Sequence, residues 1–240
     1  MLGCELGSAV EGSDAVVVRT APEEGAVDVD RGARLSVVHD RPLDPRTVGR
    51  AEVSLTSGAL AHFLEVRFDP VERAIVTRPF RGQPLEPRVR YTLAVDGARD
   101  LDGALVEPFT LTFRTGEAFT EPGPVGSTEW AQVAPIFATH CVEGCHDGAG
   151  GGLALDLRTL ASTRATALGV AADQTGGTTT IGRQGLSGMA RIEEAEPSRS
   201  YLVYKMLADP HVWGEPMPPE GPLPTADIAR VADWILGGAR

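Results

Sequence analysis

The chain has 240 residues, a formal net charge of −11 at pH 7, 28 glycines and 18 prolines. This length is enough for one large domain or two ordinary ones, and the many turn-forming residues argue against a helical bundle. Because phosphate binding needs clustered Lys and Arg, the acidic balance argues against a nucleic-acid partner and against a polybasic membrane surface. No stretch approaches the roughly 18 apolar residues of a spanning helix, so no transmembrane segment is expected in the given chain.

Residues 15–116 predict an all-β unit. Short runs rich in Val, Leu, Phe and Thr recur there with turn residues between them, which is typical of a β-sandwich. The predicted strands are residues 15–20, 34–38, 51–55, 63–68, 74–78, 88–95 and 109–114. In residues 88–95 the odd positions are apolar, so one face of that strand is expected to pack inward while its arginines face water.

Several short segments of this half carry a family resemblance. They are Thr20-Ala-Pro-Glu-Glu-Gly25, Pro42-Leu-Asp-Pro45, Tyr91-Thr92, Asp100-Leu-Asp-Gly103 and Phe113-Arg-Thr115. On these segments the half resembles the bacterial Ig-like domains that occur as modules on exported proteins. The resemblance implies a spacer or an interaction module. His39 and His62 have no partner at metal or triad spacing and are interpreted as polar surface or turn residues.

The two ends of this unit differ in composition from the strands. Residues 1–14 form an N-terminal tail in which Met-Leu-Gly-Cys4 resembles the end of a bacterial lipoprotein signal, so the true start is expected upstream and Cys4 is a possible site of a lipid anchor. A chance Gly-Cys pair is the alternative. Residues 117–128 are rich in Pro and Gly and have no apolar periodicity, as in a linker. The second domain is therefore placed at residues 129–240.

Two amphipathic helices are predicted in the second domain. Apolar residues at i, i+3, i+4 and i+7 mark one face of a helix that begins near Trp130. The same spacing recurs from Ile228 to Ile235, and Thr225 is the predicted N-cap of this second helix. Two such helices can pack together and close a shell around a large flat cofactor.

Between these helices lies the most informative motif of the chain, Cys141-Val-Glu-Gly-Cys145-His146, and Met217 follows it within Glu-Pro-Met217-Pro-Pro. Two thiols separated by a short spacer can form thioethers to the two vinyl groups of one porphyrin, and a histidine directly after the second thiol is then placed under the iron. The commoner spacer has two residues rather than three. The turn that carries the thiols is therefore expected to bulge.

Further segments extend this pattern along the second domain. They are Pro135-Ile-Phe137, Gly152-Leu-Ala-Leu-Asp-Leu157, Pro197-Ser-Arg-Ser-Tyr-Leu202, Met217-Pro-Pro-Glu-Gly-Pro-Leu223 and Asp233-Trp-Ile235. Residues 129–240 thus resemble a c-type cytochrome domain of a branch found in exported bacterial proteins, in which the three-residue spacer occurs. The resemblance implies a small helical domain with one haem c attached covalently to Cys141 and Cys145, with His146 and Met217 as the two iron ligands.

Together the two halves predict a multidomain protein, all-β followed by mainly-α, that carries electrons between redox partner proteins in the periplasm or cell envelope. Iron with both axial positions filled has no open position for a substrate. No paired acid and base and no activated nucleophile are evident in the sequence. An electron carrier is therefore expected rather than an enzyme.

Other ligand sets and another function remain open from the sequence. Met189 and Met206 are alternative iron ligands, and His211 could give a bis-histidine site. The motif's two thiols and histidine could instead bind zinc, although a fourth ligand is not evident. Finally, Cys141 and Cys145 could form a disulfide in a non-redox surface or adhesion lipoprotein that is built on a degenerate cytochrome domain.

Overall fold

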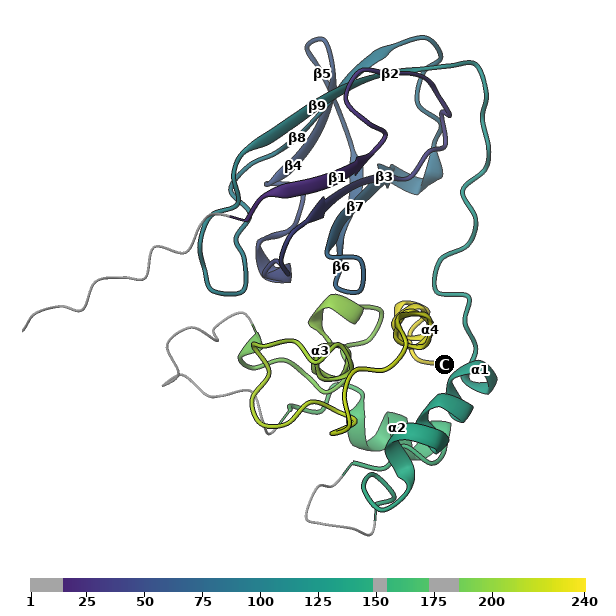
Figure 1. The fold of residues 1–240 in the computed structure, drawn as a ribbon. Helices are drawn as coiled ribbons and strands as arrows, with labels where there is room; N and C mark the ends of the chain where they lie inside the picture. The colour runs from purple at the N-terminus through teal and green to yellow at the C-terminus, as the bar shows by residue number, and fades with distance from the viewer. Residues whose placement is uncertain (1–14, 149–154, 173–185) are drawn as a thin grey trace, which may run out of the picture.

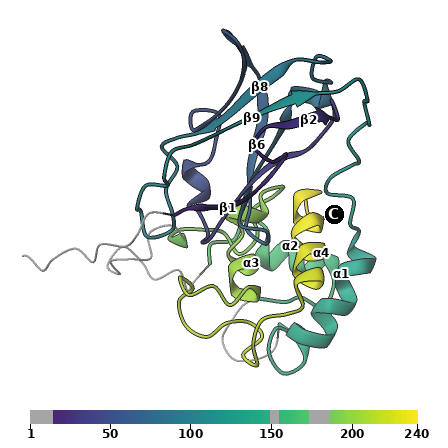
Figure 2. The same cartoon turned by 45° about the horizontal axis from the view of Figure 1, so that its top comes forward.

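The computed structural model describes residues 15–148, 155–172 and 186–240. The N-terminal tail with Cys4 lies outside these residues. The described chain forms a β-sandwich and a partly helical second half, which pack against each other (Figures 1 and 2). Within the described ranges, the helices are too short or too polar to cross a membrane.

The first half consists of two sheets that pack face to face, with strand orders β1-β3-β7-β6 and β2-β9-β8-β4-β5. The strands are β1 (Val17–Ala21), β2 (Ala26–Val29), β3 (Leu35–His39), β4 (Val53–Ser57), β5 (Leu60–His62), β6 (Leu64–Asp69), β7 (Ala74–Pro79), β8 (Arg90–Val95) and β9 (Phe109–Thr115), with short 3-10 turns η1 (Pro45–Thr47) and η2 (Phe80–Gly82). Only β2 and β9 pair in parallel; the other named pairs are antiparallel.

The sandwich core explains the alternation predicted for β8. Tyr91, Leu93 and Val95 are at most 1% exposed and lie in the core between the sheets, whereas Arg90 is exposed. The alternation is therefore confirmed. By contrast, residues 74–77 of β7 are all buried, because the outer face of this sheet is covered by the linker and the C-terminal helix.

His39 departs from the expectation. It ends β3 on the same face as Val37 and is 1% exposed, so it is a core residue rather than a surface or turn residue. Neither ring nitrogen has a hydrogen-bond partner among the described residues. Burial lowers the pKa of His39, which keeps the ring neutral and reduces the cost of placing it in the core.

The second half contains short helices joined by irregular segments. They are α1 (Trp130–Phe137), the π-helical turn η3 (Ala138–Val142), α2 (Leu160–Ala167), the 3-10 turn η5 (Pro197–Arg199), α3 (Tyr201–Met206) and α4 (Thr225–Leu236). The longest of these helices, α4, has 12 residues. The described part of this half is less helical than expected, because the proline-rich residues 209–224 form no helix. Thr225 is the first residue of α4 and makes no side-chain cap, so its prediction as N-cap was wrong.

The two predicted amphipathic helices pack together. The ring of Trp130 in α1 lies 5.5 Å from that of Trp234 in α4, and Phe137 lies 6.1 Å from Trp234 edge to face. These aromatic rings belong to one core cluster that also contains Cys141. The core of the second half therefore extends directly to the first cysteine of the motif.

The linker of residues 117–128 contains no helix or strand, but it is held at both ends. Thr120 donates from its amide and its hydroxyl to Asp30 in the sandwich. At the other end, Asp233 of α4 accepts from the amides of Gly126, Ser127 and Thr128 and from the Thr128 hydroxyl. The linker is therefore attached to both halves by hydrogen bonds.

Two loop tips of the sandwich enter the second half. Val71, in the turn between β6 and β7, packs against the core that contains α1 and α4. Leu101, in the loop between β8 and β9, is 1% exposed and lies in a cluster with Tyr201, Tyr204 and Val212. Figure 1 shows the lower loops of the sandwich facing α3 and α4. The halves therefore share buried apolar contacts.

Candidate cofactor site

Three residues that are far apart in sequence line one pocket of the second half: Cys141, His146 and Met217. The cavity volume is about 90 Å³, which is smaller than the ~300–1,000 Å³ typical of ligand sites. The walls are mostly apolar and include Leu155, Leu157, Tyr201, Leu202 and Met206. We call this the Cys141 pocket. Its apolar lining, rather than its size, suits an apolar ligand.

The local backbone brings Cys141 and His146 to the same wall. Cys141 lies in the π-helical turn η3, which is wider than an α-helical turn and agrees with the bulge that the long spacer predicts. Gly144 has φ +72°, a conformation that glycine adopts without steric cost. This reversal lets the amide of His146 donate to the carbonyl of Cys141 at 3.0 Å.

The two thiols have different surroundings. Cys141 is buried, and burial raises the pKa of its thiol to about 11, with a smaller contribution from Cys145. Cys145 is exposed and lines a second pocket together with Pro218, Pro219 and Leu223. Cys141, His146 and Met217 therefore meet in the Cys141 pocket. The fourth predicted site residue, Cys145, lines a different pocket.

His146 is a buried histidine with an unpartnered ring nitrogen: its Nδ1 has no hydrogen-bond partner among the described residues. Burial lowers the pKa of His146, and the positive charge of Arg191 lowers it further. The neutral imidazole is therefore favoured, which is the form that coordinates metals.

Met217 lies at the end of residues 209–217, which we call the methionine loop. Its amide donates to the carbonyl of Lys205 in α3 at 3.1 Å. The Nζ of Lys205 in turn donates to the carbonyls of Trp213 and Glu215, and the amide of Trp213 donates to the Tyr201 hydroxyl at 2.8 Å. One short helix thus binds the methionine loop at several points.

Two basic residues of the pocket were not predicted from the sequence. Arg191 and Lys205 both line it, and Lys205 is only 6% exposed. Burial lowers the pKa of Lys205. Its position in the otherwise apolar run of residues 201–207 is the signal that could have revealed it, since a buried lysine needs a partner. Arg191 carries no comparable signal in the sequence.

The alternative iron ligands differ in whether they line the Cys141 pocket. Met206 also lines the Cys141 pocket and is fully buried, whereas Met189 lies in the cluster around Leu101 and does not line it. His211 is engaged elsewhere: its Nδ1 lies 2.7 Å from Asp209, and it does not line the pocket. Met206 is therefore the one alternative ligand that shares the pocket with His146 among the described residues.

The zinc and disulfide alternatives gain no support from the geometry. Among residues 15–148, 155–172 and 186–240, no group of three or more His, Cys, Asp or Glu side chains is arranged to hold a metal ion. Cys141 and Cys145 are both free thiols.

Comparison with known families identifies the first half. Residues 13–115 match the family model of the bacterial Ig-like domain, so this part of the chain carries such a domain. The predicted Ig-like sandwich is thereby confirmed. No curated protein matches the chain.

Similar solved structures also align with less than half of the chain. The S-layer protein rSbsC(31-844) is 18% identical over 46% of this chain, with a TM-score of 0.33, and the chain spans 14% of its length. CopC from Methylosinus trichosporium OB3b is 11% identical over 42% of this chain and 93% of its own, with a TM-score of 0.35. PcoC from Escherichia coli, a methionine-rich copper resistance protein, is 17% identical over 43% of this chain and 99% of its own, with a TM-score of 0.35.

Proposed function

We propose that the second half binds one haem c and that the protein transfers electrons in the bacterial cell envelope. Cys141 and Cys145 would carry the two thioether bonds, and His146 and Met217 would be the axial ligands of the iron. The observation that carries the proposal is the Cys141 pocket, which gathers a thiol, an imidazole and a thioether around an apolar space.

The pocket residues fit this cofactor chemically. The unpartnered, neutral ring of His146 suits an iron ligand. The apolar walls suit the porphyrin faces, and Arg191 and Lys205 supply two positive charges for its two carboxylates. The bound haem would supply one-electron iron chemistry. A neutral thioether ligand favours the ferrous state and so raises the reduction potential relative to a second histidine.

The chain's own residues would mainly limit rearrangement during redox changes. Hydrogen bonds from Lys205 hold the methionine loop, and Pro216 and Pro218 restrict the backbone on either side of Met217. The sulfur can then stay in place while the iron changes charge. This is the property that an electron carrier needs.

Covalent attachment is the first test. The protein would be produced in a host that matures c-type cytochromes and examined by haem staining on a denaturing gel and by its reduced-minus-oxidised optical spectrum. We expect a stained band that survives acid-acetone extraction, and Cys145→Ser should abolish most of the staining. A colourless purified chain, or a fully stained Cys145→Ser variant, would contradict the proposal.

The identity of the axial thioether is the second test. Met217→Ala should leave the haem attached but lower the midpoint potential, because the iron loses its neutral sulfur ligand. Met206→Ala is the matched control, since Met206 lines the same pocket. A potential that shifts only in Met206→Ala would assign the ligand to Met206 instead.

The envelope location follows from the two family likenesses rather than from the site. Ig-like modules of this kind occur on exported proteins. In bacteria, haem is attached covalently to c-type cytochromes outside the cytoplasmic membrane, where exported proteins are also found. A lipid anchor at Cys4 would hold the protein there. Redox partner proteins would be its binding partners. Metabolic labelling with a radiolabelled fatty acid, with Cys4→Ser as control, tests the anchor.

A further inference from the structure

The Ig-like domain touches the second half close to the Cys141 pocket, through the turn of residues 99–104. Leu101 from this turn is 1% exposed and packs with Tyr201, Tyr204 and Val212. Tyr201 also lines the Cys141 pocket. A side chain of the Ig-like domain thus shares a buried cluster with a residue that lines the pocket.

The same turn also forms an ion pair with the methionine loop. Asp102 Oδ1 lies 3.3 Å from Nε2 of His211, whose Nδ1 lies 2.7 Å from Asp209. The imidazole therefore bridges a carboxylate of the Ig-like domain and one of the methionine loop. Asp102 is 57% exposed, so this pair contributes less than the buried contacts of Leu101.

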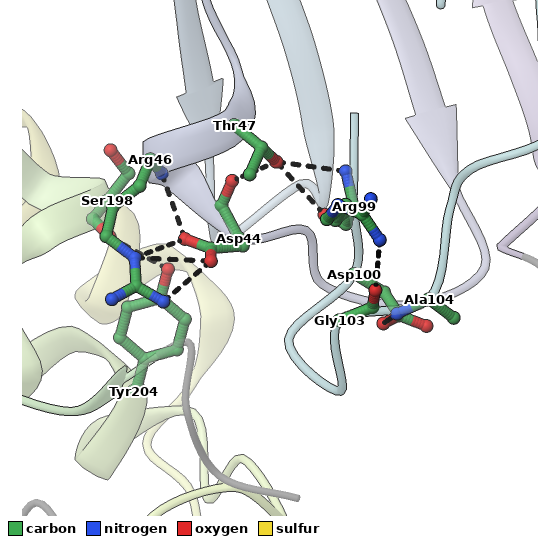
Figure 3. A network of polar contacts seen from close by, with 9 residues as sticks. All are labelled: Asp44, Arg46, Thr47, Arg99, Asp100, Gly103, Ala104, Ser198 and Tyr204. Carbon is green, nitrogen blue, oxygen red and sulfur yellow. Dashed lines mark hydrogen bonds and ion pairs between the residues drawn. The ribbon is translucent and has the colours of Figure 1, made fainter. Parts of the chain in front are cut away.

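The turn itself is braced from within, as Figure 3 shows. The Asp100 carboxylate accepts from the amide of Ala104 at 2.9 Å, and the Arg99 guanidinium donates to the Gly103 carbonyl at 2.7 Å. The hydroxyl of Thr47 accepts from the Arg99 amide. A turn with these internal bonds can present Leu101 in a fixed position.

A second contact supports the same face of the second half. The ion pair of Asp44 and Arg46, 2.7 Å apart, lies beside Ser198 and Tyr204 in Figure 3. The Tyr204 hydroxyl donates to the Ser198 carbonyl at 2.8 Å, so η5 and α3 are tied together beneath this pair. The Ig-like domain therefore also lies beside Tyr204 of α3 and Ser198 of η5.

The methionine loop is consequently held from two sides. From the second half, α3 binds it through Tyr201 and Lys205. From the Ig-like domain, Leu101 shares a buried apolar cluster with Tyr201 and Val212, and Asp102 pairs with His211. Leu186 and Met189 of the second half lie in the same cluster as Val212, so the contacts of the Ig-like domain add to the support that the second half gives the loop.

We propose that the turn of residues 99–104 is a positioning element for the methionine loop, so that the Ig-like domain keeps Met217 in the Cys141 pocket. The role of Met217 as iron ligand is taken from the proposed function. The Ig-like domain is then part of the redox unit and not a spacer between a membrane anchor and the haem.

The test uses the full haem-loaded protein with Leu101→Ala and, as the milder change, Asp102→Asn. Leu105→Ala is the matched control, because Leu105 lies in the same loop and is 48% exposed. Peptide-level hydrogen exchange measures the loop. We expect exchange in residues 209–217 to rise about tenfold in Leu101→Ala and less in Asp102→Asn, with unchanged protection of β8 and α4. Exchange equal to that of the control in both variants would overturn the proposal.

A spectroscopic measurement separates positioning from a merely structural role. The near-infrared absorption of thioether-ligated ferric haem and the midpoint potential should both fall in Leu101→Ala and stay unchanged in Leu105→Ala. A loop that loosens while both signals persist would overturn the positioning of Met217. If Met217→Ala does not alter these signals in the otherwise native protein, the proposed ligation fails, and the exchange result alone decides whether the turn holds the loop.

Discussion

The carboxylate of Asp233 joins the linker to α4, and replacing it should destabilise the protein. It accepts from three backbone amides, those of Gly126, Ser127 and Thr128, at 2.7 to 3.0 Å, and from the Thr128 hydroxyl at 2.7 Å. Burial alone would raise the pKa of Asp233, but these hydrogen bonds outweigh it and the pKa is lowered. The ionised carboxylate is therefore the form that the fold stabilises.

The size of the effect follows from the number and the exposure of these bonds. One hydrogen bond to a charged group contributes about 1.5–3 kcal/mol, and the four bonds here share one acceptor and are partly exposed, so their contributions do not add fully. We expect Asp233→Asn to lower the free energy of unfolding by about 2 kcal/mol. Asp227→Asn on the same helix removes an exposed pair with Arg230, worth roughly 0.3–0.5 kcal/mol, and a first-turn charge, worth roughly 0.3–1 kcal/mol.

Guanidinium unfolding followed by circular dichroism would measure both variants at pH 7 and at lower pH. Because the folded-state pKa of Asp233 lies below the unfolded value, its contribution is present above the unfolded pKa of ~3.9 and is lost as the pH falls through the folded value. The difference between native protein and Asp233→Asn should therefore shrink in acid. Equal stabilities of Asp233→Asn and Asp227→Asn at pH 7 would refute the reasoning.

Three further predictions follow from local geometry. Gly126→Ala should lower the unfolding temperature, because Gly126 has φ +67° and an added Cβ would lie 2.5 Å from the backbone nitrogen of Gly237, directly after α4. Gly123→Ala meets nothing within 4 Å and should be neutral, so equal melting temperatures of the two variants would contradict this prediction. In protein made without haem, alkylation at pH 8 should modify Cys145 well before Cys141, since a thiol with a pKa of about 11 is roughly 0.1% ionised; mass mapping that finds equal rates would count against it. His211 lies between the carboxylates of Asp209 and Asp102, which outweigh its burial and raise its pKa. Its contribution to stability is therefore present below pH ~6.5 and is lost as the pH rises through the pKa of the folded state. A His211→Asn variant whose stability depends on pH as in the native protein would disprove this.

Local sequence signals predicted the strands that have a clear pattern. The alternation in residues 88–95 marks β8, because one of its faces is buried and the other is exposed. The strands β2 and β5 were missed: β2 is short, includes Asp28 at φ 56°, and is held by parallel pairing to β9, which lies far along the chain. The three residues of β5 are too few to show a period. For β2 it is pairing with a distant strand that decides the structure, and for β5 it is the hairpin with its neighbour β4.

The candidate site was likewise predictable from the sequence only in part. The motif of Cys141 and His146 is visible in the sequence because its chemistry is local. The meeting of Met217 with these residues depends on contacts between distant segments, for which only the family resemblance gave a hint. Lys205 reads as one polar residue in an apolar run, and its bonds to the methionine loop appear only in three dimensions. The role of Leu101 has no sequence signal, because a leucine in a turn is common.

The linker leaves little freedom between the halves. Its hydrogen bonds to Asp30 and Asp233 leave only residues 121–125 between the two attachments, and buried loop tips join the halves on the other side. A protein that docks on the sandwich would thus meet the pocket at one fixed separation. Electron tunnelling weakens steeply with distance. Under the proposed function, the fixed distance from each docking site on the sandwich to the pocket would therefore determine how fast an electron is transferred.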